Sequence, residues 1–218
     1  SIKLYFNSFN MTKLGDNKED AIASFEEDAS TDLSELLETN VVVKFQDSDR
    51  VNKKFDSPNN EWDIDDYINV DLLEDEKDFV YTQYTEDPSL LEAVSRERDL
   101  EQKFYSGLLK SNCRVTSQPD WGDVFIHIKS KNAIDAHSIK KYVVSYRDEC
   151  HFHEEICECF YKRLKDAFDP SELLVMCLYA RRGGIDINPV RASSQDLIEK
   201  YAANLIDPEA VHIKTSKQ

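Results

Sequence analysis

One short phrase occurs twice in the chain at a fixed distance. SIKLYFNSFN opens the sequence and SIKKYVVSYR occupies residues 138–147, so that Ser, Ile, Lys, Tyr and Ser recur 137 residues apart. A second pair, DLSELL at 32–37 and DPSELL at 169–174, has the same spacing without a gap. Two separate matches with one spacing indicate a duplicated unit, and therefore a fold built from two related modules.

Each copy of the phrase has the periodicity of an amphipathic helix. In the later copy the apolar residues Ile139, Tyr142, Val143 and Tyr146 follow the i, i+3, i+4, i+7 pattern of one buried face. A serine begins each copy, where a helix N-cap belongs. We therefore expect a helix at the start of each module.

Further elements follow from the local patterns. Helices are expected at 18–30, 99–110 and 153–168, and strands at 40–46, 123–130 and 173–182. The strand at 123–130 alternates apolar and polar residues, which predicts that only one of its faces is buried. Together these elements predict an α+β fold.

The acidic composition limits the partners of the chain. The sequence has 43 Asp and Glu against 27 Lys and Arg, a net charge of −16. Clustered basic residues are needed to bind a nucleic-acid backbone, so we expect no direct contact with nucleic acid. No apolar run approaches the roughly 18 residues that span a bilayer, so no membrane association is expected. We interpret the five cysteines as reduced thiols, which predicts a cytoplasmic location.

The segment LLKSNCRVTSQPDWGD, at 108–123, joins a candidate nucleophile to a candidate acid. Cys113 would need a lowered pKa or a nearby acid–base partner to act as a nucleophile. The carboxyl group of Asp120, held beside Trp121, is expected to have a raised pKa and to serve as a proton donor. The alternative is a buried cysteine followed by a turn.

The segment CHFHEEICEC, at 150–159, contains two histidines and three cysteines. His153 and Cys157 are four residues apart and would share a helical face, which raises a zinc site as one interpretation. The chain has no Cys-x-x-Cys pair, however, and we expect no metal. The alternative is a core face on which the cysteines fill space.

The segment ARRGGIDINP, at 180–189, is the best candidate for an anion site. Arg181 and Arg182 supply guanidinium groups, and Gly183 lets the backbone approach a phosphate closely. Three lysines are candidates to assist them: Lys110, Lys140 and Lys141. The alternative is a solvated pair of arginines at a turn.

These three segments, in this order, resemble the NADPH-dependent 7-cyano-7-deazaguanine reductases, the nitrile reductases of queuosine biosynthesis, in their long two-module form. The family's leading motif is Glu-Ser-Lys-Ser-hydrophobic-Lys-Leu-Tyr, and the opening SIKLY matches it from the fourth position. The stretches at 108–122, 152–154 and 181–189 match later family motifs almost letter for letter. The likeness covers most of residues 1–192.

The resemblance implies tandem tunnelling-fold (T-fold) modules, antiparallel sheets with paired helices. It places a first module at 1–100, N-terminally incomplete and carrying an acidic insert, a second at 101–192 with the nucleophile, and a tail at 193–218. The Glu-Ser-Lys part of the leading motif would precede Ser1. A homodimer is also expected.

The resemblance also implies residue roles. Cys113 would attack the nitrile carbon to give a covalent thioimide, and Asp120 would protonate the nitrogen. Two NADPH molecules would supply two hydrides and complete the four-electron reduction to the aminomethyl product. His153 and Glu154 would hold the deazaguanine base. The cofactor phosphates would be contacted by Arg181, Arg182 and Gly183.

Two alternatives remain open at this point. One is a GTP cyclohydrolase-like T-fold hydrolase, which would use zinc on a similar purine-sized pocket. The other is a catalytically inactive purine-binding module, since the sequence begins after the Glu-Ser-Lys triplet that contributes to the family's site.

Overall fold

The computed structural model describes residues 2–45, 64–75, 80–182, 184–203, 215 and 217. The chain divides into two compact units, Ser1–Asp49 and Arg50–Gln218. The first unit is helical and the second contains a mixed sheet with helices, so the expected α+β class is confirmed. None of the described helices combines the length and apolar character that a bilayer crossing requires.

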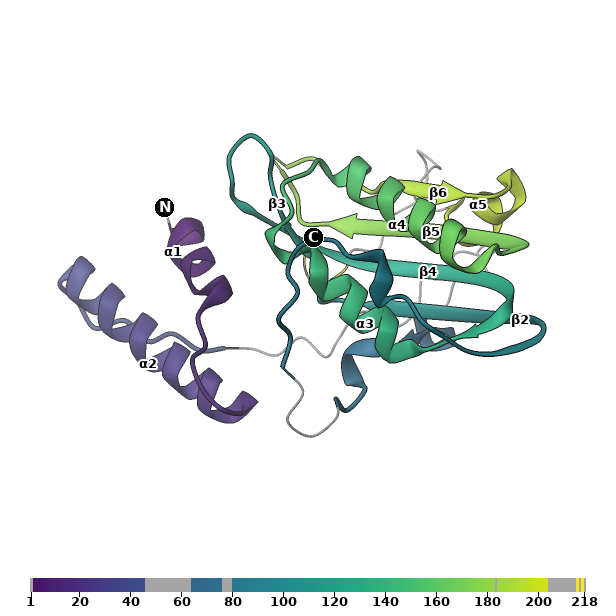
Figure 1. The fold of residues 1–218 in the computed structure, drawn as a ribbon. Coiled ribbons are helices and arrows are strands. Elements are labelled where there is room, and N and C mark those ends of the chain that lie inside the picture. The colour runs from purple at the N-terminus through teal and green to yellow at the C-terminus, as the bar shows by residue number, and fades with distance from the viewer. Residues whose placement is uncertain are drawn as a thin grey trace. The chain divides into compact units, whose positions relative to one another are not determined.

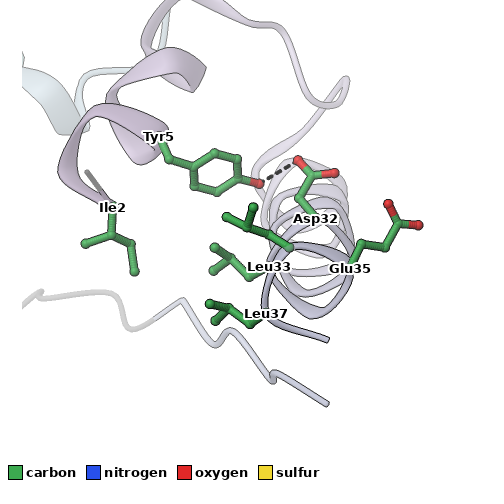
Figure 2. A pocket seen from close by; sticks show the side chains of 7 residues that line it. Ile2, Tyr5, Asp32, Leu33, Glu35 and Leu37 are labelled. Atoms are coloured by element: carbon green, nitrogen blue, oxygen red, sulfur yellow. Dashed lines mark hydrogen bonds between the residues drawn. The ribbon is translucent and has the colours of Figure 1, made fainter. Parts of the chain in front are cut away.

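The first unit consists of helix α1 (Ile2–Ser8), a 3-10 turn at Phe9–Met11 and helix α2 (Lys18–Leu37). Aromatic rings of α1 and of the 3-10 turn pack on Phe25 of α2, with centroids 5.8 Å away for Phe6 and 5.2 Å, edge to face, for Phe9. Figure 2 shows a cleft between α1 and α2 in which Tyr5 donates a hydrogen bond of 2.8 Å to Asp32. No predicted site residue lines this cleft.

The strand expected at 40–46 is wrong over residues 40–45, the part that the structure describes. The backbone amides of this segment donate to side chains of α2 instead of to another strand. Val43 N bonds Ser30 Oγ at 2.9 Å, and Phe45 N bonds Glu26 Oε1 at 2.8 Å. The apolar run therefore lies along a helix as extended chain.

The second unit is built on one sheet (Figure 1). Its strands, in the order β1-β2-β4-β5-β6 with β3 paired to the start of β4, are β1 (Ile68–Asn69), β2 (Ala93–Ser106), β3 (Lys110–Asn112), β4 (Pro119–Ile134), β5 (Glu172–Tyr179) and β6 (Val190–Ala192). Its α-helices are α3 (Ala136–Val144), α4 (His153–Phe168) and α5 (Gln195–Tyr201). The 3-10 turns are Ile64–Asp66, Val70–Leu72, Pro88–Leu90 and Ser145–Asp148.

Both faces of the central strand β4 are buried. Val124, Ile126 and Ile128 join the core beneath α3 and α4, which lie on one face of the sheet in Figure 1. Phe125 points to the other face, where it packs in a second cluster with Leu197 of α5. The prediction of a strand at 123–130 is confirmed, but the expectation of a single buried face is wrong because α5 covers the second one.

The prediction of a helix at 99–110 is wrong. These residues belong to β2, a turn at Gly107 and β3. Their charged, straight side chains suit a helix, but the ladder to β4 decides the conformation, with Phe104 opposite Ile126 and Gln102 opposite Ile128. Residue 100, the expected end of the first module, therefore lies within a strand.

The two copies of the repeat agree only in part. Each SIK phrase forms a helix followed by a 3-10 turn. DLSELL completes α2, whereas DPSELL leaves α4 at Asp169, a left-handed C-cap with φ of 42°, and enters β5. The N-caps of α2 and α4, Asn17 and Phe152, are 135 residues apart instead of 137. The division into two T-fold modules stays a prediction.

Phe160 tests the helix-to-sheet core. Its ring is fully buried and stacks on Tyr146 at 4.6 Å between centroids. We expect Phe160→Ala to lower the free energy of unfolding by about 3–5 kcal/mol, because it removes buried contacts and leaves a cavity. The matched control Phe152→Ala, whose ring is 44% exposed, should cost less than about 1 kcal/mol. Equal losses in chemical denaturation would contradict this assignment of the core.

Candidate active site

Three segments far apart in the sequence meet at one end of the sheet. The start of β4 contributes Asp120, the N-terminus of α4 contributes His153, and the turn after β5 contributes Arg182. The ladder fixes this meeting, because Gly122 lies opposite Tyr179 and Trp121 O accepts a hydrogen bond of 2.8 Å from Ala180 N. The chain after β5 is thereby held beside Asp120.

Asp120 is the centre of this group. The residue is only 5% exposed, and Arg182 donates to Oδ1 through both Nε, at 2.7 Å, and Nη2. The other carboxylate oxygen, Oδ2, lies 3.2 Å from His153 Nε2. A buried carboxylate between two basic side chains is well compensated, whereas an isolated one would be very costly.

The environment of Asp120 lowers the pKa of its carboxyl group, whereas the sequence predicted a raised pKa. Burial alone would raise the pKa of the carboxyl group, but the contacts and positive charge of His153 and Arg182 outweigh burial and lower it. The prediction of a raised pKa beside Trp121 is therefore wrong. Asp120 is an ionised acceptor in this arrangement, and it must receive a proton before it can donate one.

Cys113 lies in the tight connection between β3 and β4. Its backbone N–H donates to Gln118 O at 2.8 Å, and its carbonyl accepts from Ser117 N at 2.8 Å. The neighbouring Asn112 donates to Glu149 O at 2.7 Å and accepts from His151 N at 3.2 Å. These bonds hold the cysteine against the segment that leads into α4.

The thiol of Cys113 has the electrostatic setting of a nucleophile. Hydrogen bonds from the Thr116 hydroxyl and from the backbone N–H groups of Thr116 and Val115 lower its pKa, and the charge of Arg182 adds to this effect. Arg182 therefore acts on both groups, strongly on Asp120 through direct contact and weakly on Cys113 through its charge alone. The predicted acid–base partnership of Cys113 and Asp120 stays a prediction, and Asp120 begins in the ionised form.

The remaining predicted site residues have different settings. Glu154 is exposed in the first turn of α4, one residue after the buried His153. Arg181 forms an exposed pair with Asp186, with Nε and Oδ1 2.7 Å apart. Gly183 lies outside the described residues.

Two of the lysines proposed to assist an anion site are committed elsewhere. Lys110 is buried and donates to Arg147 O at 2.6 Å. Lys140 donates to Leu73 O at 2.8 Å and pairs with Asp75 at 3.0 Å. Each lysine is already held by these partners, so the structure does not support the suggestion that they assist Arg182.

Of the three cysteines in the 150–159 segment, Cys157 belongs to the core, whereas Cys150 is exposed and Cys159 is half-buried. Cys157 is fully buried, and its Sγ lies 3.5 Å from Val175 O and 3.4 Å from Pro189 O. All five cysteines are free thiols. In the part of the chain that the structure describes, no three His, Cys, Asp or Glu side chains gather as a metal-binding group.

Comparison with known proteins places this geometry in a family. A family model described as "QueF-like protein" matches residues 119–197, which include Asp120, His153 and Arg182. A protein of Psychrobacter cryohalolentis is 34% identical over 203 residues, covering 91% of this chain and 68% of its own length. Its name is NADPH-dependent 7-cyano-7-deazaguanine reductase. The chain belongs to this family.

Other members of the reductase family agree. The Colwellia psychrerythraea reductase is 36% identical over 201 residues, and an Acinetobacter baumannii reductase is 38% identical over 194 residues. Each alignment covers 88% of this chain and 64% of the relative, so the chain spans about two thirds of the length of these curated reductases. A crystal structure of an apo archaeosine synthase QueF-Like gives a TM-score of 0.38 at 23% identity, covering 43% of this chain and 91% of its own.

The reactivity of Cys113 can be measured without substrate. Because its pKa is lowered, we expect Cys113 to be alkylated by iodoacetamide at neutral pH faster than the exposed Cys150. Thr116→Val removes the hydroxyl donor, so the pKa of Cys113 should rise and the pH midpoint of alkylation should move upward. Thr116→Ser keeps the hydroxyl and should retain the wild-type midpoint. Mass spectrometry of the labelled peptide measures the midpoint. An unchanged midpoint in Thr116→Val would contradict the hydrogen bond of Thr116 as the cause of the lowered pKa.

Proposed function

We propose that this chain carries the reaction centre of a nitrile reductase that converts 7-cyano-7-deazaguanine to its aminomethyl product with NADPH, a step in queuosine biosynthesis. The observation that carries the proposal is the buried carboxylate of Asp120 between Arg182 and His153, and the lowered pKa of the Cys113 thiol supports it. Membership of the reductase family supports the choice of substrate and cofactor.

The first chemical step needs a thiolate and a place for one proton. The sulfur of Cys113 forms a bond to the nitrile carbon, one of the carbon–nitrogen π bonds breaks, and the nitrogen takes up a proton, which gives a thioimide. The thiol loses one proton and the nitrogen gains one, so a single carboxylate can accept the proton from sulfur and pass it to nitrogen. Asp120 suits this relay because it starts ionised, whereas an acid with a raised pKa would suit donation alone.

The base of the substrate needs polar partners near the start of α4. A carboxylate can accept two hydrogen bonds from the amino and ring N–H groups of a guanine-like edge. Glu154 is exposed in the first helical turn and is able to reach a ligand there. The adjacent His153 is buried beside Asp120, so we assign it to proton transfer and positioning near the nitrile.

The arginines in the turn after β5 are hydrogen-bond donors suited to the phosphates of NADPH. Two molecules of NADPH would supply the two hydrides of the four-electron reduction. Arg181 fits best, because its pair with Asp186 is exposed and such pairs are weak enough to exchange for a phosphate. Arg182 is held by the buried Asp120, and its main role here is to keep that carboxylate ionised. Contacts of Arg182 and Gly183 with the cofactor, a homodimer and a cytoplasmic location stay predictions.

An assay of NADPH oxidation that depends on 7-cyano-7-deazaguanine tests the proposal in the full-length protein. Cys113→Ala should bind the base but abolish turnover, because no thioimide can form, while the matched Cys150→Ala should retain wild-type rates. A metal chelator should leave the activity unchanged, whereas a zinc hydrolase would lose activity and would not consume NADPH. Substantial nitrile reduction by Cys113→Ala would overturn the mechanism, and no nitrile-dependent oxidation by the full-length protein would overturn the function.

A further inference from the structure

The ring of His153 is fixed by a neighbour that no motif predicts. Tyr179, the last residue of β5, is fully buried, and its ring stacks on the imidazole with centroids 4.0 Å apart and planes 19° apart. An imidazole can turn about its side-chain bonds, and each turn changes which atom faces a neighbour. A flat stack on one face allows only orientations that keep the ring in this plane.

The plane held by the stack brings the imidazole beside Asp120. In this plane Nε2 of His153 lies 3.2 Å from Asp120 Oδ2, while Arg182 occupies Oδ1. A rotation that leaves the stack would move Nε2 away from the carboxylate. The phenol ring therefore fixes the plane in which the His153 imidazole lies beside Asp120.

Gly122 provides the space that the stack requires. It lies directly opposite Tyr179 in the β4–β5 ladder. A Cβ atom at this position would come within 2.9 Å of Tyr179 Cδ1 and 3.0 Å of Cε1, closer than packed atoms approach. Since both residues are held in the ladder, any side chain at 122 must displace the tyrosine ring, and with it the surface on which His153 rests.

We propose that Tyr179 is a positioning residue for the reaction, which holds the His153 ring in the plane that brings it beside Asp120, and that Gly122 is required because it leaves room for the tyrosine ring. The proposal rests on the proposed function for the role of His153, but the geometry that it describes is testable without it. The stacked ring is the requirement and the phenol hydroxyl is not, so phenylalanine should replace tyrosine and an aliphatic residue should not.

Nuclear magnetic resonance of the histidine ring protons in the intact protein measures the stack directly. A ring that lies flat on another shifts the neighbour's ring protons upfield, so the His153 signals should be shifted in the wild type and in Tyr179→Phe. They should move back towards ordinary values in Tyr179→Leu and in Gly122→Ala. The signals of His127, which packs on Tyr201 at 4.5 Å, serve as an internal control and should not change.

Gly107→Ala is the matched control for Gly122→Ala. A Cβ atom at 107 would meet only the tips of side chains, at 3.1 Å or more, and none of them belongs to His153 or Tyr179. Its His153 signals should equal those of the wild type. Unchanged His153 signals in Tyr179→Leu and Gly122→Ala would overturn the proposal, as would equal losses in Tyr179→Phe and Tyr179→Leu.

The turnover number separates positioning from simple packing. We expect kcat of Tyr179→Leu to fall by about ten- to a hundredfold, with a smaller change in KM, because a misplaced catalytic group loses rate more than binding. Tyr179→Phe should recover most of the rate. If the signals shift as expected but kcat of Tyr179→Leu equals that of the wild type, the positioning role is wrong. Failure of the wild type to reduce the nitrile would instead overturn the proposed function, while the spectra still decide the stack.

Discussion

The buried contact between Asp120 and Arg182 is the interaction on which the rest of the site depends. A carboxylate that is 5% exposed is stable in its ionised form only if a positive charge accompanies it. Arg182 is 62 residues away in sequence and reaches Asp120 only because β4 and β5 pair in one register. The contact of the other carboxylate oxygen, Oδ2, with His153 requires α4 to begin beside β4, because His153 is the first residue of α4. The sheet and the helix layer must therefore form together before the site exists.

This pair also connects the strongly acidic chain to the chemistry proposed for it. With a net charge of −16, the protein gives little general attraction to an anionic cofactor, so local arginines have to supply it. Arg182 instead lowers the pKa of Asp120 and adds a small effect to the hydrogen bonds of Thr116 and Val115 that lower the pKa of Cys113, and Arg181 remains at the surface with Asp186. Under the proposed function, one arginine keeps the proton relay ionised and the next is available to a phosphate. The two residues of the Arg-Arg motif are not equivalent.

Part of this account follows from the sequence and part does not. The helix at 153–168 and the strand at 173–182 were predictable because their periodicity and burial agree, and only the ends of the strand differ from β5. The prediction of a helix at 99–110 failed because pairing with β4 outweighs the helix propensity of its side chains. Cys113, Asp120, His153 and Arg182 were found through motifs, but the lowered pKa of Asp120 depends on partners that only the register brings near. Tyr179 was hidden within an apolar run, where nothing distinguishes a stacking ring from core.

The pH titration of the Asp120 side-chain carboxyl carbon, followed by NMR, tests the central claim most directly. The account predicts that this group titrates below the ordinary range of aspartate in the wild type, so that it is ionised throughout the neutral range. Arg182→Ala should raise the pKa of Asp120, because burial then acts against the charge with only His153 to oppose it. Arg181→Ala, which breaks only the exposed pair with Asp186, should leave it unchanged. Equal pKa values of Asp120 in the wild type and in Arg182→Ala would contradict the account.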